Sequence, residues 1–144
     1  MGGNMRTFRS IVGLLLAGLL GLSGFTASAA TPVEIQRSFE PAARAGTPGF
    51  SGFSAARGQQ FFSSAHGNDW SCTSCHTASP VAPGRHAKTG KEIAALAPAA
   101  NPQRFTDAAK VEKWFKRNCN DVLGRICSAQ EKGDVLAYLM SLAK

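Results

Sequence analysis

The stretch NDWSCTSCHTASP, residues 68–80, contains two cysteines separated by two residues and followed directly by a histidine. These are Cys72, Cys75 and His76, and their spacing is the attachment pattern of a c-type haem. The two thiols would form thioethers with the two vinyl groups of one porphyrin, which places the histidine under the iron. The motif therefore predicts one covalent haem c, held by Cys72 and Cys75, with His76 as an axial iron ligand.

Two other kinds of site use the same cysteine spacing. A redox-active Cys-x-x-Cys of the thioredoxin type is expected near a strand–helix–strand unit, and no segment here has the two-residue alternation of a strand. A zinc site needs four ligands, and the remaining cysteines, Cys119 and Cys127, lie far along the chain. The four cysteines thus form two unlike pairs, which favours one haem attachment and one structural bridge.

The N-terminal segment has the parts of a secretory signal peptide. Arg6 and Arg9 precede an apolar run over residues 11–22, and an Ala-Ser-Ala sequence that fits the cleavage rule ends at Ala29. The run is shorter than the roughly 20 residues of a membrane-spanning helix, although an uncleaved anchor is the alternative. We expect residues 1–29 to be a signal peptide cleaved near Ala29, and the protein to be periplasmic.

The remainder has the size of one domain with one modest core. We expect an N-terminal helix and linker over residues 30–53 and a monohaem cytochrome c domain over residues 54–144. The formal net charge of +7 falls to +5 when Arg6 and Arg9 are removed. A mild positive excess can steer a protein toward an acidic partner, whereas nucleic acid is not an expected partner of an exported chain.

The apolar spacing and the capping residues predict an all-α fold with long loops. The expected helices cover residues 31–45, 54–64, 107–118 and 128–142, with Ser54, Thr106 and Ser128 as their N-caps where a cap is evident. Residues 78–105 are rich in Pro, Gly and Ala and are expected to be loop, with one helical turn around residues 92–96. A loop of this length is unusual unless it packs on a cofactor, which supports the haem.

Two of these helices carry a pattern for close contact. Gly58 and Phe62 lie four residues apart before the haem motif, and Tyr138 lies in the last helix. A glycine lets a second helix approach closely, and aromatic side chains can fix the crossing. The arrangement resembles the contact between the terminal helices in class I cytochromes c. Ordinary core aromatics are the alternative.

The sixth position of the iron has no evident methionine ligand. Met140 falls inside the last helix, where a core position is expected. His66 is close to His76 in sequence and is expected near the proximal side or at the surface. His86 lies between basic residues in a Gly/Pro segment, where a solvated loop is expected.

Asn118 is a further candidate. It shares a helical face with Val111, Trp114 and Phe115, so its polar amide is directed toward the core. A buried amide without a partner costs about 1–3 kcal/mol. Periodicity alone favours a C-terminal helix cap for this asparagine, and ligation of iron by its carbonyl oxygen is the other reading.

Three stretches downstream of the haem motif resemble the sphaeroides haem protein family of monohaem c-type cytochromes. They are TGKEIAALAP (residues 89–98), RFTDAAKVEKWFKRNCNDVLGRIC (residues 104–127) and QEKGDVLAYL (residues 130–139). In that family the asparagine of the RNC sequence is the sixth haem ligand, and the following cysteine is disulfide-bonded. The resemblance implies that Asn118 ligates the iron and that Cys119 is bridged to Cys127, and Gly124 can supply a positive φ in the enclosed turn.

The resemblance also implies a function. In that family the asparagine leaves the iron on reduction and opens it to oxygen or nitric oxide, and the suspected partners are a dihaem cytochrome c and a membrane b-type cytochrome. A neutral, hard amide oxygen suits ferric iron and binds ferrous iron poorly. The alternatives are an electron-transfer cytochrome c with a permanent sixth ligand and an exported thiol–disulfide protein without haem.

Overall fold

The computed structural model describes residues 1–2, 29–67 and 69–143. The expected signal peptide over residues 1–29 therefore falls almost entirely outside the described residues. No described helix is long and apolar enough to cross a membrane.

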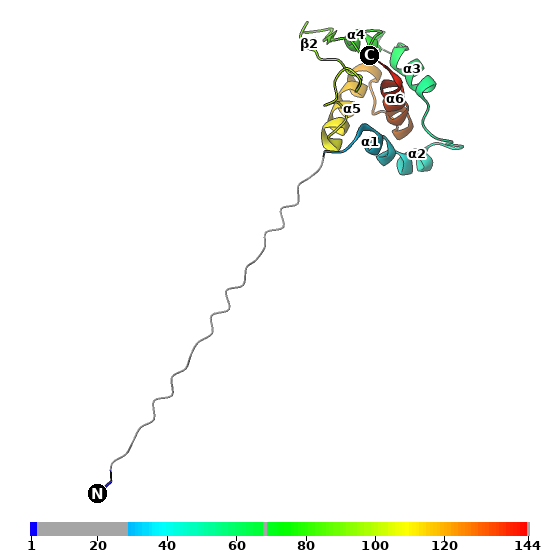
Figure 1. Ribbon diagram of the computed structural model, residues 1–144. Helices are drawn as coiled ribbons and strands as arrows, with labels where there is room; N and C mark the ends of the chain where they lie inside the picture. The colour runs from blue at the N-terminus through cyan, green and yellow to red at the C-terminus, as the bar shows by residue number, and fades with distance from the viewer. Residues whose placement is uncertain (3–28, 68, 144) are drawn as a thin grey trace.

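The described residues form six helices and one two-stranded hairpin (Figure 1). In chain order they are α1 (Pro32–Ser38), α2 (Glu40–Gly46), α3 (Ala55–Ser63), α4 (Thr73–His76), β1 (Gly84–Arg85), β2 (Glu92–Ile93), α5 (Ala108–Leu123) and α6 (Ala129–Ser141). The prediction of an all-α fold is confirmed, with the antiparallel hairpin β1–β2 as an addition.

The single helix expected over residues 31–45 is wrong, because the chain forms α1 and α2 instead. Phe39 separates them and serves both as the C-cap of α1 and as the N-cap of α2. Pro41 explains the break, since proline is tolerated in the first turn of a helix but removes a hydrogen bond from its interior. Thr31 and Glu34 form a capping box that begins α1.

The crossing of α3 and α6 is the most extensive helix contact in the described part of the chain (Figure 1). A Cβ atom at Gly58 would collide with the backbone carbonyl of Asp134, so only glycine permits this approach. The rings of Phe62 and Tyr138 then lie 5.6 Å apart between centroids. Two of the three predicted caps are also confirmed, because Ser54 caps α3 and Ser128 forms a capping box at the start of α6.

The core consists of two clusters that share α6. The first contains Ile35, Phe39, Val111 and Leu136, and the second contains Phe62, Val135, Tyr138 and Leu139. Partly buried Phe105 and Phe115 contact both clusters. The N-terminal helices therefore belong to the same core as the rest of the domain.

Helix α5 differs from its prediction at both ends. Its N-cap is Asp107, whose side chain accepts a hydrogen bond from the backbone N–H of Lys110 at 3.0 Å, and not Thr106. Its last residue is Leu123, so the helix continues past Asn118 to Gly124, which has the left-handed φ of 69° typical of a helix C-terminus. A carboxylate is a stronger cap than a threonine hydroxyl, and the glycine provides the stop.

The long loop over residues 78–105 is ordered by its own hydrogen bonds. The helical turn expected at residues 92–96 is wrong, because Glu92 and Ile93 pair with Arg85 and Gly84 as strands. The carbonyl of Pro80 accepts hydrogen bonds from the backbone N–H groups of Leu96 and Ala97. Cross-strand pairing thus overrides the local helix preference of the Ala-rich segment.

Candidate functional site

The haem motif forms one short turn of helix, α4. Cys72 is its N-cap, the backbone N–H of His76 donates to the Cys72 carbonyl at 3.0 Å, and Thr77 ends the turn with a positive φ of 61°. Cys72 and Cys75 are both free thiols and both half-buried. One turn therefore brings together the two thiols and the imidazole that a c-type haem requires.

The hairpin β1–β2 lies directly against α4. A Cβ atom at Gly84 would collide with the carbonyl oxygen of Cys75, and its next contact would be the Cα atom of His76. The backbone N–H of Ala87 lies 3.4 Å from the Cys75 sulfur and donates to it. Sequence reasoning missed this role of Gly84, although its place after Pro83 in a Gly/Pro segment was a signal for a tight turn.

His76 lies inside the domain, with its ring 6.3 Å from that of Phe62 between centroids. Burial, and secondly the positive charge of Arg104, lower its pKa to about 4. The imidazole is therefore neutral at physiological pH, as a metal ligand must be. Among the described residues neither ring nitrogen has a hydrogen-bond partner, so a lone pair is free for iron.

The thiol of Cys72 is poorly suited to redox catalysis. Burial raises its pKa to about 11, and the neighbouring Cys75 adds to the shift. A catalytic thiol needs a lowered pKa, because the thiolate is the nucleophile. The geometry therefore disfavours the thiol–disulfide alternative and favours the haem.

Asn118 lies on the inward side of α5. It is seven residues after Val111 and four before Val122, both of which are buried, so all three share one face of the helix. Nevertheless Asn118 is exposed, and Trp114 on the adjoining part of that face is 43% exposed. The helix continues beyond Asn118, so the C-cap reading is wrong.

This inward side of α5 fits a large apolar group. Among the described residues α5 is not packed closely on α4 or on the hairpin, and Figure 1 shows the three as separate parts of the domain. Cys72, Leu96, Phe105 and Phe115 are only partly buried at the edge of the second cluster. A thiol pair, a neutral imidazole and apolar walls together suit a covalent haem.

The other proposed ligands have local partners. His66 Nε2 lies 2.8 Å from the Phe61 carbonyl, and the two rings are 4.6 Å apart. His86 Nδ1 accepts a hydrogen bond from the backbone N–H of Thr89 at 3.3 Å inside the hairpin loop. Met140 packs against the first core cluster.

A disulfide joins Cys119 to Cys127, with 5.6 Å between the two Cα atoms. Both residues are buried, and Gly124 turns the chain between them. Arg125 in this loop forms two hydrogen bonds with Glu131 at the start of α6, at 2.8 and 2.6 Å. The C-terminal part of α5, from Cys119 onward, is therefore fixed to the loop before α6 and through it to the start of α6.

Comparison with known proteins agrees with this geometry. Residues 48–139 match the family described as Domain of unknown function (DUF1924). Cytochrome c-type protein SHP of Cereibacter sphaeroides is 59% identical over 69 residues, which are 48% of this chain and 53% of that protein. Cytochrome c'' of Methylophilus methylotrophus is 47% identical over 83 residues, which are 58% of each chain. These matches span a little over half the length of the curated relatives.

Solved structures match over a larger share. Oxidised SHP, described as an oxygen-binding cytochrome c, has a TM-score of 0.68 and 44% identity and covers 79% of this chain and 99% of its own. Oxidised cytochrome c'' has a TM-score of 0.71 and 37% identity and covers 78% and 95%. A solution structure of cytochrome c'', described in connection with haem-ligand detachment, has a TM-score of 0.69. Together with the matched residues 48–139, this shows that the chain belongs to the DUF1924 family of SHP-like monohaem c-type cytochromes and that its cofactor is one covalent haem c.

Proposed function

We propose that this cytochrome accepts electrons and, once Asn118 has left the reduced iron, binds a diatomic molecule such as oxygen or nitric oxide. The observation that carries the proposal is the position of Asn118, an exposed amide on the same helix face as buried Val111 and Val122. The oxygen binding of SHP and the haem-ligand detachment described for cytochrome c'' support it by similarity.

The residues have distinct tasks in this proposal. Cys72 and Cys75 hold the haem covalently, and His76 is the permanent axial ligand. The bound haem supplies a one-electron couple and an iron position that a small molecule can occupy. The Asn118 amide oxygen is a hard, neutral ligand, so its affinity falls when the metal is reduced.

The disulfide limits how Asn118 leaves. Cys119 is the next residue and is tied to Cys127, and α5 continues regularly to Leu123. The backbone at Asn118 is thus held in place, and the amide departs by rotation about its own side-chain bonds. Such a movement is small and reversible, and it leaves the helix and the core intact.

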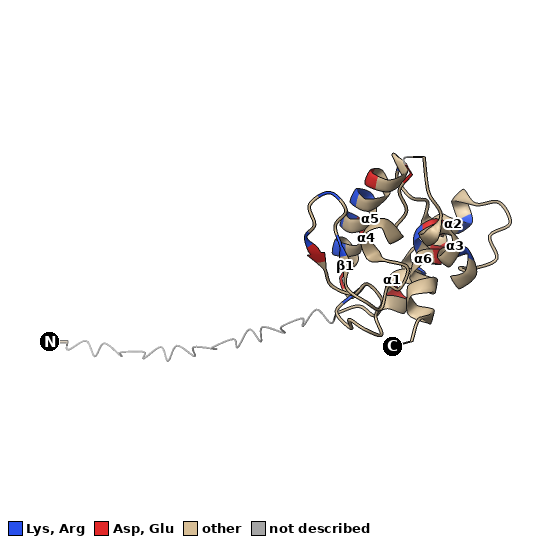
Figure 2. Ribbon diagram, turned by 90° about the horizontal axis from the view of Figure 1, so that it is seen from above, with Lys and Arg blue, Asp and Glu red and all other residues tan. Residues whose placement is uncertain are grey.

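The outer face of α5 suits an acidic electron donor. Lys113, Lys116 and Arg117 surround a shallow depression of about 400 Å³ that Asn120 and Ile126 complete. Figure 2 shows Lys and Arg recurring along α5 and the adjacent hairpin. Ile126 is 63% exposed, so an apolar contact is encircled by positive charge, as in electrostatically steered interfaces. A dihaem cytochrome c or a membrane b-type cytochrome with an acidic surface fits this requirement.

The proposed location is the periplasm, with residues 1–29 as the signal peptide. Its basic start, apolar centre and Ala-Ser-Ala end support export. Covalent haem attachment through two thiols is consistent with this location. Mass spectrometry of the mature protein tests the cleavage near Ala29.

The ligand proposal is tested in the holoprotein with Asn118→Ala. We expect a strong change in the ferric absorption spectrum and almost none in the ferrous spectrum, because the amide has already left the reduced iron. Carbon monoxide, used as the probe, should bind the reduced wild type rapidly. Asn118→His should instead give a low-spin spectrum in both states and slow carbon monoxide binding.

Asn120→Ala is the matched control, since Asn120 is an exposed asparagine on the outer face of the same helix. It should leave all spectra unchanged. His66→Ala and His86→Ala test the other ligands. If Asn118→Ala retains the wild-type ferric spectrum while one histidine variant loses its sixth ligand, the protein is a bis-histidine electron carrier and the proposal is wrong.

A further inference from the structure

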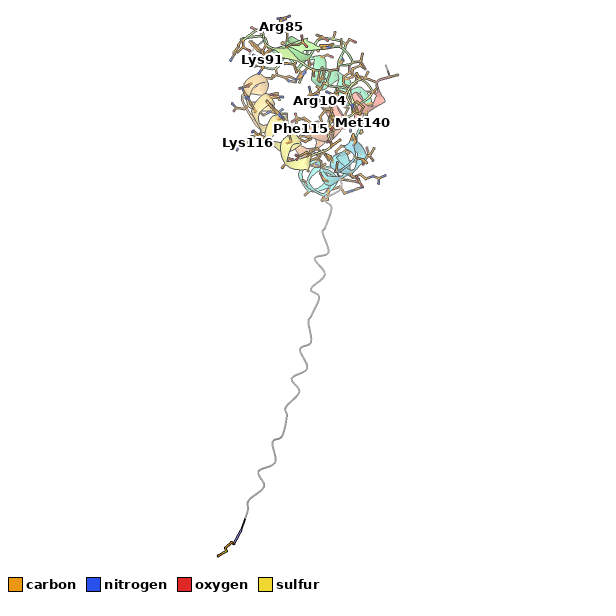
Figure 3. All side chains as sticks on the ribbon, turned by 60° about the vertical axis from the view of Figure 1, so that its left-hand side comes forward. Arg85, Lys91, Arg104, Phe115, Lys116 and Met140 are labelled. Atoms are coloured by element: carbon orange, nitrogen blue, oxygen red, sulfur yellow. A yellow bond between two sulfur atoms is a disulfide. The ribbon has the colours of Figure 1, made fainter. Side chains whose placement is uncertain are left out.

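Arg104 is held inside the loop that follows the hairpin. Its Nε atom donates to the Ala95 carbonyl at 2.9 Å, and its Nη2 atom donates to the Ala94 carbonyl at 2.6 Å. Asn101 Nδ2 also donates to the Ala95 carbonyl, at 3.3 Å. Figure 3 shows Arg104 toward the middle of the domain, whereas Arg85 and Lys91 lie at its edge. The guanidinium is therefore fixed in position by the loop carbonyls.

This guanidinium has no anionic partner among the described residues. Arg57 pairs with Asp134 and Arg125 pairs with Glu131, but none of the ion pairs in the described part of the chain includes Arg104. Its Nη1 atom has no hydrogen-bond partner there either. Burial lowers the pKa of Arg104, which reflects the cost of removing its charge from water. A half-buried, uncompensated cation calls for an anion.

The haem itself supplies such an anion. Leu96 follows the Ala95 carbonyl that Arg104 binds, and Phe105 follows Arg104 itself. Both pack against the same core cluster as Cys72, so the loop that holds Arg104 lies beside the haem motif. Haem c carries two propionate groups, and a guanidinium offers the paired N–H geometry that carboxylates prefer. We propose that Arg104 binds a haem propionate and thereby sets the reduction potential of the iron. The inference rests on haem binding and is independent of whether Asn118 leaves.

The sign of the effect follows from charge. Reduction adds one electron to the haem, and a neighbouring carboxylate opposes that addition unless a cation neutralises it. Removing the charge of Arg104 should therefore stabilise the ferric state. We expect Arg104→Gln to shift the equilibrium for reduction by about tenfold toward ferric, which corresponds to a potential lower by about 59 mV for one electron.

Arg85→Gln is the matched control. Arg85 also donates to a backbone carbonyl, that of Gly90, at 2.8 Å, but it is exposed at the edge of the domain. The variant removes an equal charge and one hydrogen bond to a loop carbonyl, where Arg104→Gln removes two. Because solvent screens an exposed charge, its potential should move by much less than that of Arg104→Gln.

Arg104→Lys separates the charge from the loop contacts. Lysine keeps the charge but cannot donate to Ala94 and Ala95 in the same geometry, so we expect the potential to recover while thermal stability stays lowered. The propionate bending bands in the resonance Raman spectrum should shift in Arg104→Gln and not in Arg85→Gln. These measurements use holoprotein, and the Arg104 variants should leave the spectral features assigned to Asn118 ligation unchanged.

The proposal is overturned if Arg104→Gln moves the potential no further than Arg85→Gln. It is also overturned if Arg104→Lys and Arg104→Gln lower the potential equally, because the arginine would then act only by holding the loop through its hydrogen bonds to Ala94 and Ala95. Should Arg104→Gln yield too little holoprotein, the lysine variant decides. The propionate bands of Arg104→Lys must differ from those of the wild type, because a single ammonium group replaces a guanidinium with paired N–H donors. Unchanged bands would refute the contact.

Discussion

The two sides of this domain are stabilised in different ways. On one side α3 crosses α6 through Gly58, and aromatic side chains fill the contact without help from another molecule. On the other side α4 and the hairpin contact each other, α5 is not packed closely on either among the described residues, and Asn118 and Trp114 remain exposed on α5. The α3–α6 side therefore supplies a self-contained protein core, whereas the side with the haem motif is less completely filled by protein. The proposed exchange of the iron ligand belongs to this second side.

The largest effect is expected from removing both thiols of the haem motif. The double variant Cys72→Ala, Cys75→Ala cannot form thioethers, so covalent haem should be lost almost completely. The measurement is a pyridine haemochrome spectrum after denaturation, which retains only covalently attached haem. The double variant Cys119→Ala, Cys127→Ala is the control and should keep its haem. Normal haem content in the first variant would contradict the attachment site.

The next largest effect is expected from a substitution of Gly58 in the contact between α3 and α6. In Gly58→Ala the Cβ atom would collide with the backbone of Asp134, which cannot rotate away as a side chain can. We therefore expect the free energy of unfolding to fall by about 3 kcal/mol. Gly133→Ala is the matched control, because its Cβ meets the movable ring of Phe53 and alanine favours the helix by about 1 kcal/mol. Denaturant unfolding measures both. Equal losses would mean that the crossing is not limited by Gly58.

Loss of the disulfide should have a smaller effect. The bridge spans a sequence separation of 8, and chain-entropy reasoning assigns such a loop about 2.5 kcal/mol. We expect the double variant Cys119→Ala, Cys127→Ala to lose roughly this amount in denaturant unfolding. In the wild type, mass spectrometry after alkylation without reductant should find neither cysteine modified. Complete alkylation of both would refute the bridge.

The smallest effect concerns Glu131, which connects the disulfide loop to α6. Burial opposes its ionisation, but hydrogen bonds from Arg125 and Ser128 outweigh that and lower the pKa below its ordinary 4.5. Because the folded-state pKa is depressed, the stabilisation is present above pH 4.5 and is lost as the pH falls through the folded value. Arg125 is 53% exposed at its side chain, so the contribution is less than about 1 kcal/mol.

Thermal unfolding of the wild type and of Glu131→Gln measures this difference across pH. The wild type should be slightly more stable at pH 7, and the two curves should converge in acid. A difference that persists at low pH would show that packing, and not charge, accounts for the contribution of Glu131.

Much of this architecture was predictable because it depends on local chemistry. The spacing of Cys72, Cys75 and His76 gives the cofactor, and Ser54 and Ser128 give the starts of α3 and α6 through hydrogen bonds to nearby backbone N–H groups. Gly58 predicts the close helix crossing because the absence of a side chain lets a second helix approach. The haem motif and the caps depend on residues within a few positions of the signal, whereas the crossing joins distant segments and was predictable from the glycine itself.

The predictions that were wrong concern features that depend on the tertiary structure or on a choice between neighbouring helix-start and helix-end signals. Apolar spacing predicted one helix where Pro41 imposes two, and the Ala-rich residues after Glu92 hid a strand pairing. Periodicity alone favoured a cap at Asn118, because it could not show that the helix continues to Leu123. Arg104 was missed because its partners are the carbonyls of Ala94 and Ala95, ten and nine residues earlier in the chain.

The position of α6 has a consequence for how the chain folds. This helix of 13 residues packs against α1, α2 and α3, although residues 64–128 intervene between α3 and α6. The loop between those partners must close before their contacts can form, which costs entropy and slows folding. A nascent chain that lacks α6 leaves Ile35 and Phe62 without the surface that buries them. The core therefore cannot be completed until α6 has been synthesised.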